Sequence, residues 1–196
     1  MTVNVQKRRR YRVRRMTREL PAEREISPGR RLYMLLTVIA AAGVFVGAYT
    51  YSGGEINAGG GFVSAFVTSL CSVGIYVLMF FFGGLSAVGQ PMGYILCFFK
   101  GLGTGYLAAY AACAMKSGDV CAVLNILPFE AVSMVTVILG ARENIRMSSY
   151  ISGRSFGTSG EASDEGSLRL YLAKFALILL TGIAAAAMRG LMAAVL

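Results

Sequence analysis

Residues 56–99 decide the fold, and they read INAGGGFVSAFVTSLCSVGIYVLMFFFGGLSAVGQPMGYILCFF. None of these 44 residues is charged. A helix needs roughly 20 apolar residues to cross the hydrocarbon core of a bilayer, so the stretch is long enough for two crossings. Gly83-Gly84 and Gly89-Gln90-Pro91 interrupt it near its middle. The sequence therefore predicts one helix at about 62–82 and another that begins near Pro91, a residue suited to the first turn of a helix.

The flanking sequence supplies the other crossings. Residues 32–54 form an uncharged run of 23 residues, which predicts a helix at about 32–53. The helix that begins near 91 is expected to end at about 115, before the polar turn at 116–119. Asp119 closes that turn and is suited to capping a helix at about 120–141.

A fifth helix is expected at about 169–190. Its uncharged part, between Lys174 and Arg189, is only 14 residues long. We therefore expect both charged side chains to extend toward the two membrane interfaces. The resulting fold class is an all-α membrane protein, a bundle of about five transmembrane helices over residues 32–196. The strict alternation of a transmembrane β-barrel is missing from these runs.

The formal net charge of +9 is concentrated at the N-terminus. Residues 1–31 hold 11 Lys or Arg and 3 Asp or Glu, whereas the other 165 residues hold 8 and 7. Because short basic segments remain in the cytoplasm, we expect a cytoplasmic N-terminus and an outside C-terminus. Residues 142–168 would then be a flexible cytoplasmic loop, rich in Gly and Ser. A docking or modification site in this loop is the alternative to a plain linker.

Residues 7–15 carry seven basic side chains in nine positions. Near an anionic membrane surface each is worth about 1 kcal/mol, so we interpret the run as a lipid-surface anchor. A polycation can also bind nucleic acid through its phosphates, but we expect no specific nucleic-acid partner. The anchor residues are Lys7, Arg8, Arg9, Arg10, Arg12, Arg14 and Arg15.

Two charges interrupt the predicted membrane spans, Lys100 and Glu130. They lie nine or ten residues into antiparallel neighbouring helices joined by a four-residue turn, so both fall near the same depth. A lone charge at that depth costs several kcal/mol, which predicts that the two side chains pair. Pro128 is expected to kink the helix and to release the carbonyl of Leu124. The pair is either a structural lock or part of a polar pathway.

Small residues follow Lys100 at helical spacing. Gly101, Gly105 and Ala109 form a small-xxx-small stripe, which predicts close packing against another helix. The alternative, a phosphate-binding loop, lacks the preceding strand and the full glycine spacing.

The chain offers little for catalysis. It has no His, which excludes His-dependent triads and His-ligated metal sites. We expect no enzyme activity, no cofactor and no metal site. The four cysteines lie in the apolar spans, where cysteine behaves as a small hydrophobic residue. They are Cys71, Cys97, Cys113 and Cys121.

Two segments resemble the stage II sporulation protein M family. Gly89-Gln90-Pro91 and residues 98–106, FFKGLGTGY, are similar to the family's glycine–proline turn and glycine-rich helix. Residues 126–130, ILPFE, followed by Ala141-Arg142, are similar to its fourth helix. The resemblance would cover about residues 30–190.

The resemblance implies a multi-pass protein of the cell membrane. Members act in sporulation as scaffolds at the septal and engulfing membrane. They recruit two cell-wall hydrolases, stage II sporulation proteins D and P, for septal peptidoglycan thinning and forespore engulfment, and perform no chemistry themselves. The alternative function is a small transporter or channel subunit in which Lys100 and Glu130 line a polar pathway.

Overall fold

The structure, a computed structural model, describes residues 28–53, 61–86, 89–155 and 164–195. Its contacts divide the chain into two units, residues 1–31 and residues 32–196. The helical bundle from Leu32 onward belongs to the second unit. Within the described residues all regular secondary structure is α-helical.

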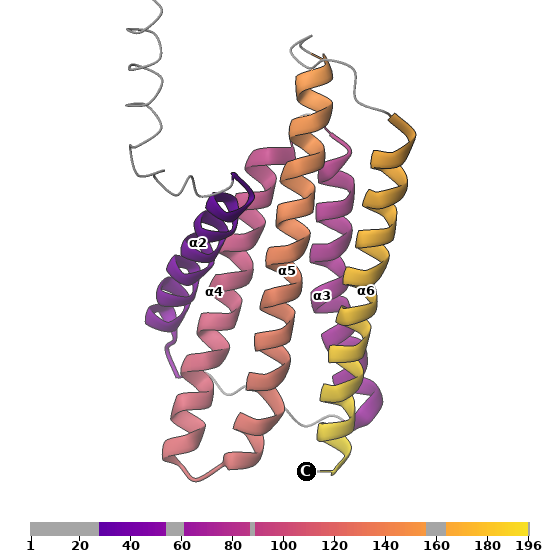
Figure 1. The fold of residues 1–196 in the computed structure, drawn as a ribbon. Helices are drawn as coiled ribbons and strands as arrows, with labels where there is room; N and C mark the ends of the chain where they lie inside the picture. The colour runs from indigo at the N-terminus through magenta and orange to yellow at the C-terminus, as the bar shows by residue number, and fades with distance from the viewer. Residues whose placement is uncertain (1–27, 54–60, 87–88, 156–163, 196) are drawn as a thin grey trace, which may run out of the picture. The chain divides into compact units, whose positions relative to one another are not determined.

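Five helices in the described part of the chain are long and apolar enough to cross a membrane. The prediction of an all-α bundle of five such helices is therefore confirmed (Figure 1). The helices are α2 (Pro28–Thr50), α3 (Phe62–Gly84), α4 (Gly89–Lys116), α5 (Val120–Ser155) and α6 (Asp164–Val195).

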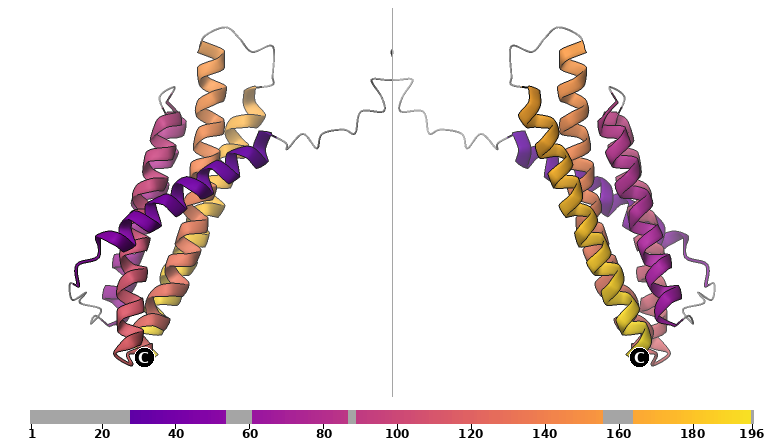
Figure 2. Two further views of the ribbon diagram at one scale, coloured as in Figure 1. Left: turned by 90° about the vertical axis from the view of Figure 1, so that its left-hand side faces the viewer. Right: turned by 90° about the vertical axis from the view of Figure 1, so that its right-hand side faces the viewer.

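Helix α5 occupies the centre of the bundle, in contact with α3, α4 and α6. Successive helices of the bundle run in opposite directions (Figure 1). Helix α2 packs on α4 and crosses the bundle obliquely, as Figure 2 shows. We call the two ends of the bundle the Arg142 end and the Asp119 end, after residues of α5 and of the turn before it.

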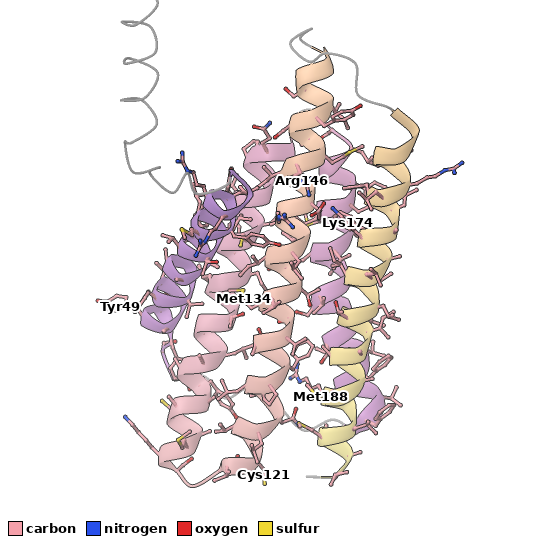
Figure 3. All side chains as sticks on the ribbon, viewed as in Figure 1. Tyr49, Cys121, Met134, Arg146, Lys174 and Met188 are labelled. Atoms are coloured by element: carbon pink, nitrogen blue, oxygen red, sulfur yellow. The ribbon has the colours of Figure 1, made fainter. Side chains whose placement is uncertain are left out.

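The core is apolar, and so is the outer surface. Phe80 and Leu36 are fully buried, whereas Phe45 is 78% exposed and Tyr49, which points away from the bundle in Figure 3, is 94% exposed. Water would not solvate such a surface, but lipid chains would. The five apolar helices and this outer surface are those of a multi-pass membrane protein.

Helix α5 is longer than predicted. It has 36 residues, about 54 Å at 1.5 Å per residue, against a hydrocarbon core of about 30 Å. The predicted end at 141 and the predicted loop at 142–168 are therefore wrong for residues 142–155. The segment stays helical because Ile145 and Ser148 are buried against the rest of the bundle.

The other end of that loop is wrong as well, because α6 begins at Asp164 rather than near 169. Residues 156–163 lie outside the described part of the chain.

The predicted break at Gly83-Gly84 is also displaced. Both glycines lie inside α3, because their missing side chains leave room for Asn144 and Tyr171. The helix ends before Leu85 and Ser86, which are not helical, and α4 begins at Gly89, two residues before its expected start. Pro91 consequently lies in the first turn of α4, where its missing N–H has no consequence.

The remaining helix ends differ only slightly from expectation. Helix α2 begins at Pro28 and ends at Thr50 rather than at 53, and Gly53 adopts a positive φ of 82° just beyond it. The predicted cap of α5 is confirmed, because the backbone N–H of Ala122 donates to Oδ1 of Asp119 at 3.1 Å.

Candidate functional site

The central helix α5 carries most of the buried polar side chains. Eight polar or charged residues are buried in the described part of the chain, and six of them belong to α5. Because each needs a partner in a dry interior, their contacts identify the candidate sites. The six are Glu130, Ser133, Thr136, Glu143, Asn144 and Ser148.

The structure brings Lys100 and Glu130 together in the middle of the bundle. Nζ of Lys100 lies 2.9 Å from Oε2 of Glu130, and both side chains are 5% exposed. Thr104, one turn beyond Lys100, donates to the same carboxylate oxygen at 2.8 Å. The hydroxyl of Ser133 lies 3.5 Å from it. We call these four residues the central cluster.

The geometry of the central cluster is that of a closed ion pair. The short turn between α4 and α5 fixes the register that brings the two charges to the same depth. The two hydroxyl groups approach the carboxylate as well, so the buried anion has several partners. Removing one partner from such a pair costs about 3–5 kcal/mol, because the other charge is left buried alone.

Pro128 lies inside α5, which remains helical through it. Since proline has no N–H, the carbonyl of Leu124 loses its usual backbone donor. A bend of α5 is therefore expected at this turn. The kink itself stays a prediction.

Arg189 turns into the bundle near the Asp119 end. Its Nε donates to Oδ1 of Asn125 at 3.4 Å and its NH1 donates to Oγ of Ser69 at 3.1 Å. The guanidinium also lies 5.1 Å from the centre of the Phe129 ring. The expectation that Arg189 extends to the membrane interface is therefore wrong, because partners on α3 and α5 hold it inside.

A second charged cluster lies toward the Arg142 end. The side chain of Glu143 is 10% exposed, and Oε2 lies 2.8 Å from Nζ of Lys174. Its other oxygen, Oε1, lies 3.3 Å from NH1 of Arg142 and 3.4 Å from NH1 of Arg146. We call these four residues the Glu143 cluster.

The Glu143 cluster ties together three helices. Lys174 comes from α6, and Arg142 reaches α2, where its NH1 donates to the hydroxyl of Tyr33 at 2.8 Å. The guanidinium also lies 4.4 Å from the centre of the Tyr33 ring. Sequence reasoning missed this cluster, because Arg142, Glu143 and Arg146 fall in the segment predicted to be a loop and Lys174 lies 31 residues beyond Glu143.

Side chains of α5 and α6 bind the carbonyl groups at the end of α3. Nδ2 of Asn144 donates to the Phe80 carbonyl at 2.7 Å, and the Tyr171 hydroxyl donates to the Phe81 carbonyl at 2.8 Å. The Phe81 carbonyl is among the last four of α3, which have no backbone donor within the helix, so these contacts anchor the end of α3. The sequence signal for these contacts was the spacing of Asn144 and Ser148, two polar residues one helical turn apart on α5.

The predicted glycine stripe packs α4 against α2. A Cβ atom on Gly101 would overlap the Ala40 carbonyl oxygen, and one on Gly105 would overlap the Val44 carbonyl oxygen. The facing residues of α2 are also glycines, Gly43 and Gly47, which the sequence analysis did not identify.

The third member of the predicted stripe, Ala109, is half-buried.

The remaining predictions concern the lipid-surface anchor, metal binding and the cysteines. The lipid-surface anchor at residues 7–15 lies outside the described part of the chain. Among the described residues, no three His, Cys, Asp or Glu side chains converge on a point that could hold a metal. Cys97 is buried, and Cys71, Cys113 and Cys121 are exposed.

Comparisons with protein-family models, with curated protein sequences and with solved structures found no match to this chain. The resemblance to the stage II sporulation protein M family therefore depends on its own residues, those of α4 and α5 described above.

Proposed function

We propose that this chain is an integral membrane scaffold that positions partner proteins and performs no chemistry itself. The observation that carries the proposal is the closure of the central cluster. Lys100 and Glu130 bond to each other, and the nearby hydroxyl groups complete the set. A buried pair of this kind fixes the register of two helices, which is what a rigid platform requires.

The proposed platform is the end of α5 that extends past the hydrocarbon core. Residues 142–155 continue the helix by about 21 Å at 1.5 Å per residue. The Glu143 cluster braces its first turns against α2 and α6. An extended and braced helix end provides a surface on which a partner can dock.

In the proposed orientation the Arg142 end faces the cytoplasm and the C-terminus lies outside. The basic residues near the start of α2, together with Arg142, Arg146 and Lys174, support it through the positive-inside rule. A reporter fused after Leu196 should be active outside the cell. A cytoplasmic reporter would contradict the orientation.

The proposed partners are cell-wall hydrolases, and the proposed location is the septal and engulfing membrane of a sporulating cell. The support is the resemblance of residues 89–106 and 126–142 to the stage II sporulation protein M family. Peptidoglycan cleavage would belong to the partners.

Co-purification tests the scaffold. The tagged chain is recovered from gently solubilised membranes, and the proteins that accompany it are identified against untagged membranes. We expect cell-wall hydrolases in the eluate. An eluate without any hydrolase from cells undergoing septal thinning would contradict the proposed partners.

The competing function is a small transporter. Ser133 and Thr136 continue along α5 from Glu130, so the buried polar groups extend beyond the ion pair. Ion flux through liposomes that contain the purified chain, abolished by Glu130→Gln, would establish that function and overturn the scaffold as a closed structure.

A further inference from the structure

We propose that the groove between α5 and α6 beside Glu143 binds the phosphate of an anionic phospholipid headgroup. The groove has a volume of about 230 Å³ and opens to the surroundings. Its charged members come from both helices, and Figure 3 shows Arg146 on α5 and Lys174 on α6 at a similar level. The lining of the groove includes Glu143, Arg146, Met147, Leu170 and Lys174.

The Glu143 cluster has more positive than negative charges. One carboxylate, Glu143, is shared among three cations, Arg142, Arg146 and Lys174. Two positive charges therefore remain without a matching anion in this cluster. Side chains of Arg146 and Lys174 are 53% and 31% exposed, so both can still donate to an incoming group.

The two cations of the groove are held close to each other. Glu143 is 10% exposed and contacts both groove cations, 2.8 Å from Lys174 and 3.4 Å from Arg146, so it holds them beside one another. A phosphate offers several acceptor oxygens, and bonds between guanidinium or ammonium groups and phosphate are the strong, charge-assisted kind. The preset pair of cations therefore favours an anionic phosphate headgroup over a zwitterionic one, in which an ammonium group offsets the charge of the phosphate.

The groove lies at the depth where the hydrocarbon core is expected to end. From its start at Val120, α5 crosses a core of about 30 Å in about 20 residues, so the core ends near residue 140. Glu143 and Arg146 lie within two turns of that point. The α3–α4 turn lies at the same level, because Ser148 donates to the Ser86 carbonyl at 2.8 Å. Basic pockets between helices at this level are typical sites for anionic headgroups.

Part of the groove lining is apolar. Leu170 is 56% exposed and Met147 lines the groove beside it, so a ligand must satisfy both charged and apolar surfaces. A cavity of 230 Å³ is smaller than the roughly 300–1,000 Å³ of pockets that enclose a drug-sized molecule. It suits a headgroup whose acyl chains continue along the helices.

The experiment measures lipid binding to the purified full-length chain in detergent micelles. Phosphatidylglycerol and phosphatidylcholine with identical acyl chains are titrated, and bound lipid is counted by native mass spectrometry. Arg146→Gln removes a groove cation, and Arg169→Gln is the matched control, since Arg169 is an exposed cation of α6 outside the groove lining. Inorganic phosphate is added as a competitor in a separate arm.

We expect phosphatidylglycerol to bind more tightly than phosphatidylcholine. Arg146→Gln should weaken phosphatidylglycerol about tenfold, and Arg169→Gln less than about twofold. Arg146→Lys should retain most of the binding. If Arg146→Gln fails to fold, Leu170→Glu places a carboxylate on the exposed wall and should weaken phosphatidylglycerol equally.

Equal binding of the two lipids, or equal loss in Arg146→Gln and Arg169→Gln, would overturn the proposal. Displacement of the lipid by inorganic phosphate at equal concentration would assign the groove to a soluble anion and would also overturn it. The measurement involves no hydrolase, so its failure leaves the proposed scaffold to be judged by co-purification alone.

Discussion

At the scale of single residues, burial decides which polar groups matter. The sequence predicted that Lys100 and Glu130 share a depth, because their positions follow from two helix lengths and one short turn. It did not predict Thr104 and Ser133 as further partners of the carboxylate, because those depend on how two helices rotate against each other. Arg189 was misjudged for the same reason, since its partners, Asn125 and Ser69, come from other helices.

The ion pair can be tested by exchanging its members. Lys100→Glu and Glu130→Lys should each lower expression and thermal stability, because each places two like charges in the core. Truncating one partner of such a pair costs about 3–5 kcal/mol, and charge reversal should cost at least as much. The double exchange should recover much of the loss in melting temperature measured in detergent. A double variant no more stable than the single ones would contradict the pairing.

The glycine stripe offers a matched comparison within one helix. Gly101→Ala should destabilise the protein, because the new methyl group would overlap the carbonyl oxygen of Ala40 on α2. Gly103→Ala meets open space, so it should be neutral or raise stability by up to about 1 kcal/mol through helix propensity. Thermal unfolding in detergent measures both. Equal effects of the two substitutions would show that α2 does not pack at Gly101.

At the scale of helices, the apolar runs and the polar breaks between them were sufficient to place all five. The largest error in a predicted helix end, that of α5, came from the polar residues that follow residue 141. Residues 142–155 contain charged and small polar residues, which in a membrane protein suggest a loop. Outside the hydrocarbon core, however, a helix can pack through polar contacts, such as those of Glu143 with Lys174 and of Ser148 with Ser86. Such contacts join helices distant in sequence, so a local pattern does not reveal them.

Hydrogen exchange can distinguish a helix from a loop at residues 142–153. Backbone amides there should exchange slowly, because they are bonded within α5 and braced by the Glu143 cluster. Residues 51–53, which are described but not helical, should exchange rapidly and serve as the control. Exchange of 142–153 as fast as that of 51–53 would show that α5 ends near 141.

At the scale of the whole molecule, charge is distributed unevenly along the bundle. The described part has three cations around Glu143 toward the Arg142 end, a closed pair in the middle, and Arg189 held inside toward the Asp119 end. The first of these three groups has three cations for one carboxylate, with Arg146 and Lys174 partly exposed, and it lies where a membrane surface would begin. The positive-inside rule and the proposed lipid groove thus assign the same end of the bundle to the same membrane face.

Cysteine labelling can test which face that is. Cys121 is exposed at the Asp119 end (Figure 3), and Ser149 is exposed on α5 toward the Arg142 end. One variant keeps Cys121 and has the other three cysteines replaced by alanine. A second variant has all four replaced and carries Ser149→Cys. In the proposed orientation, a membrane-impermeant maleimide should label Cys121 in intact cells and should label the second variant only after permeabilisation. The reverse pattern would overturn the orientation. The two sites lie about 42 Å apart along one helix at 1.5 Å per residue, so a helix that crosses the membrane places them on opposite faces. Labelling of both sites in intact cells would therefore show that α5 does not cross the membrane.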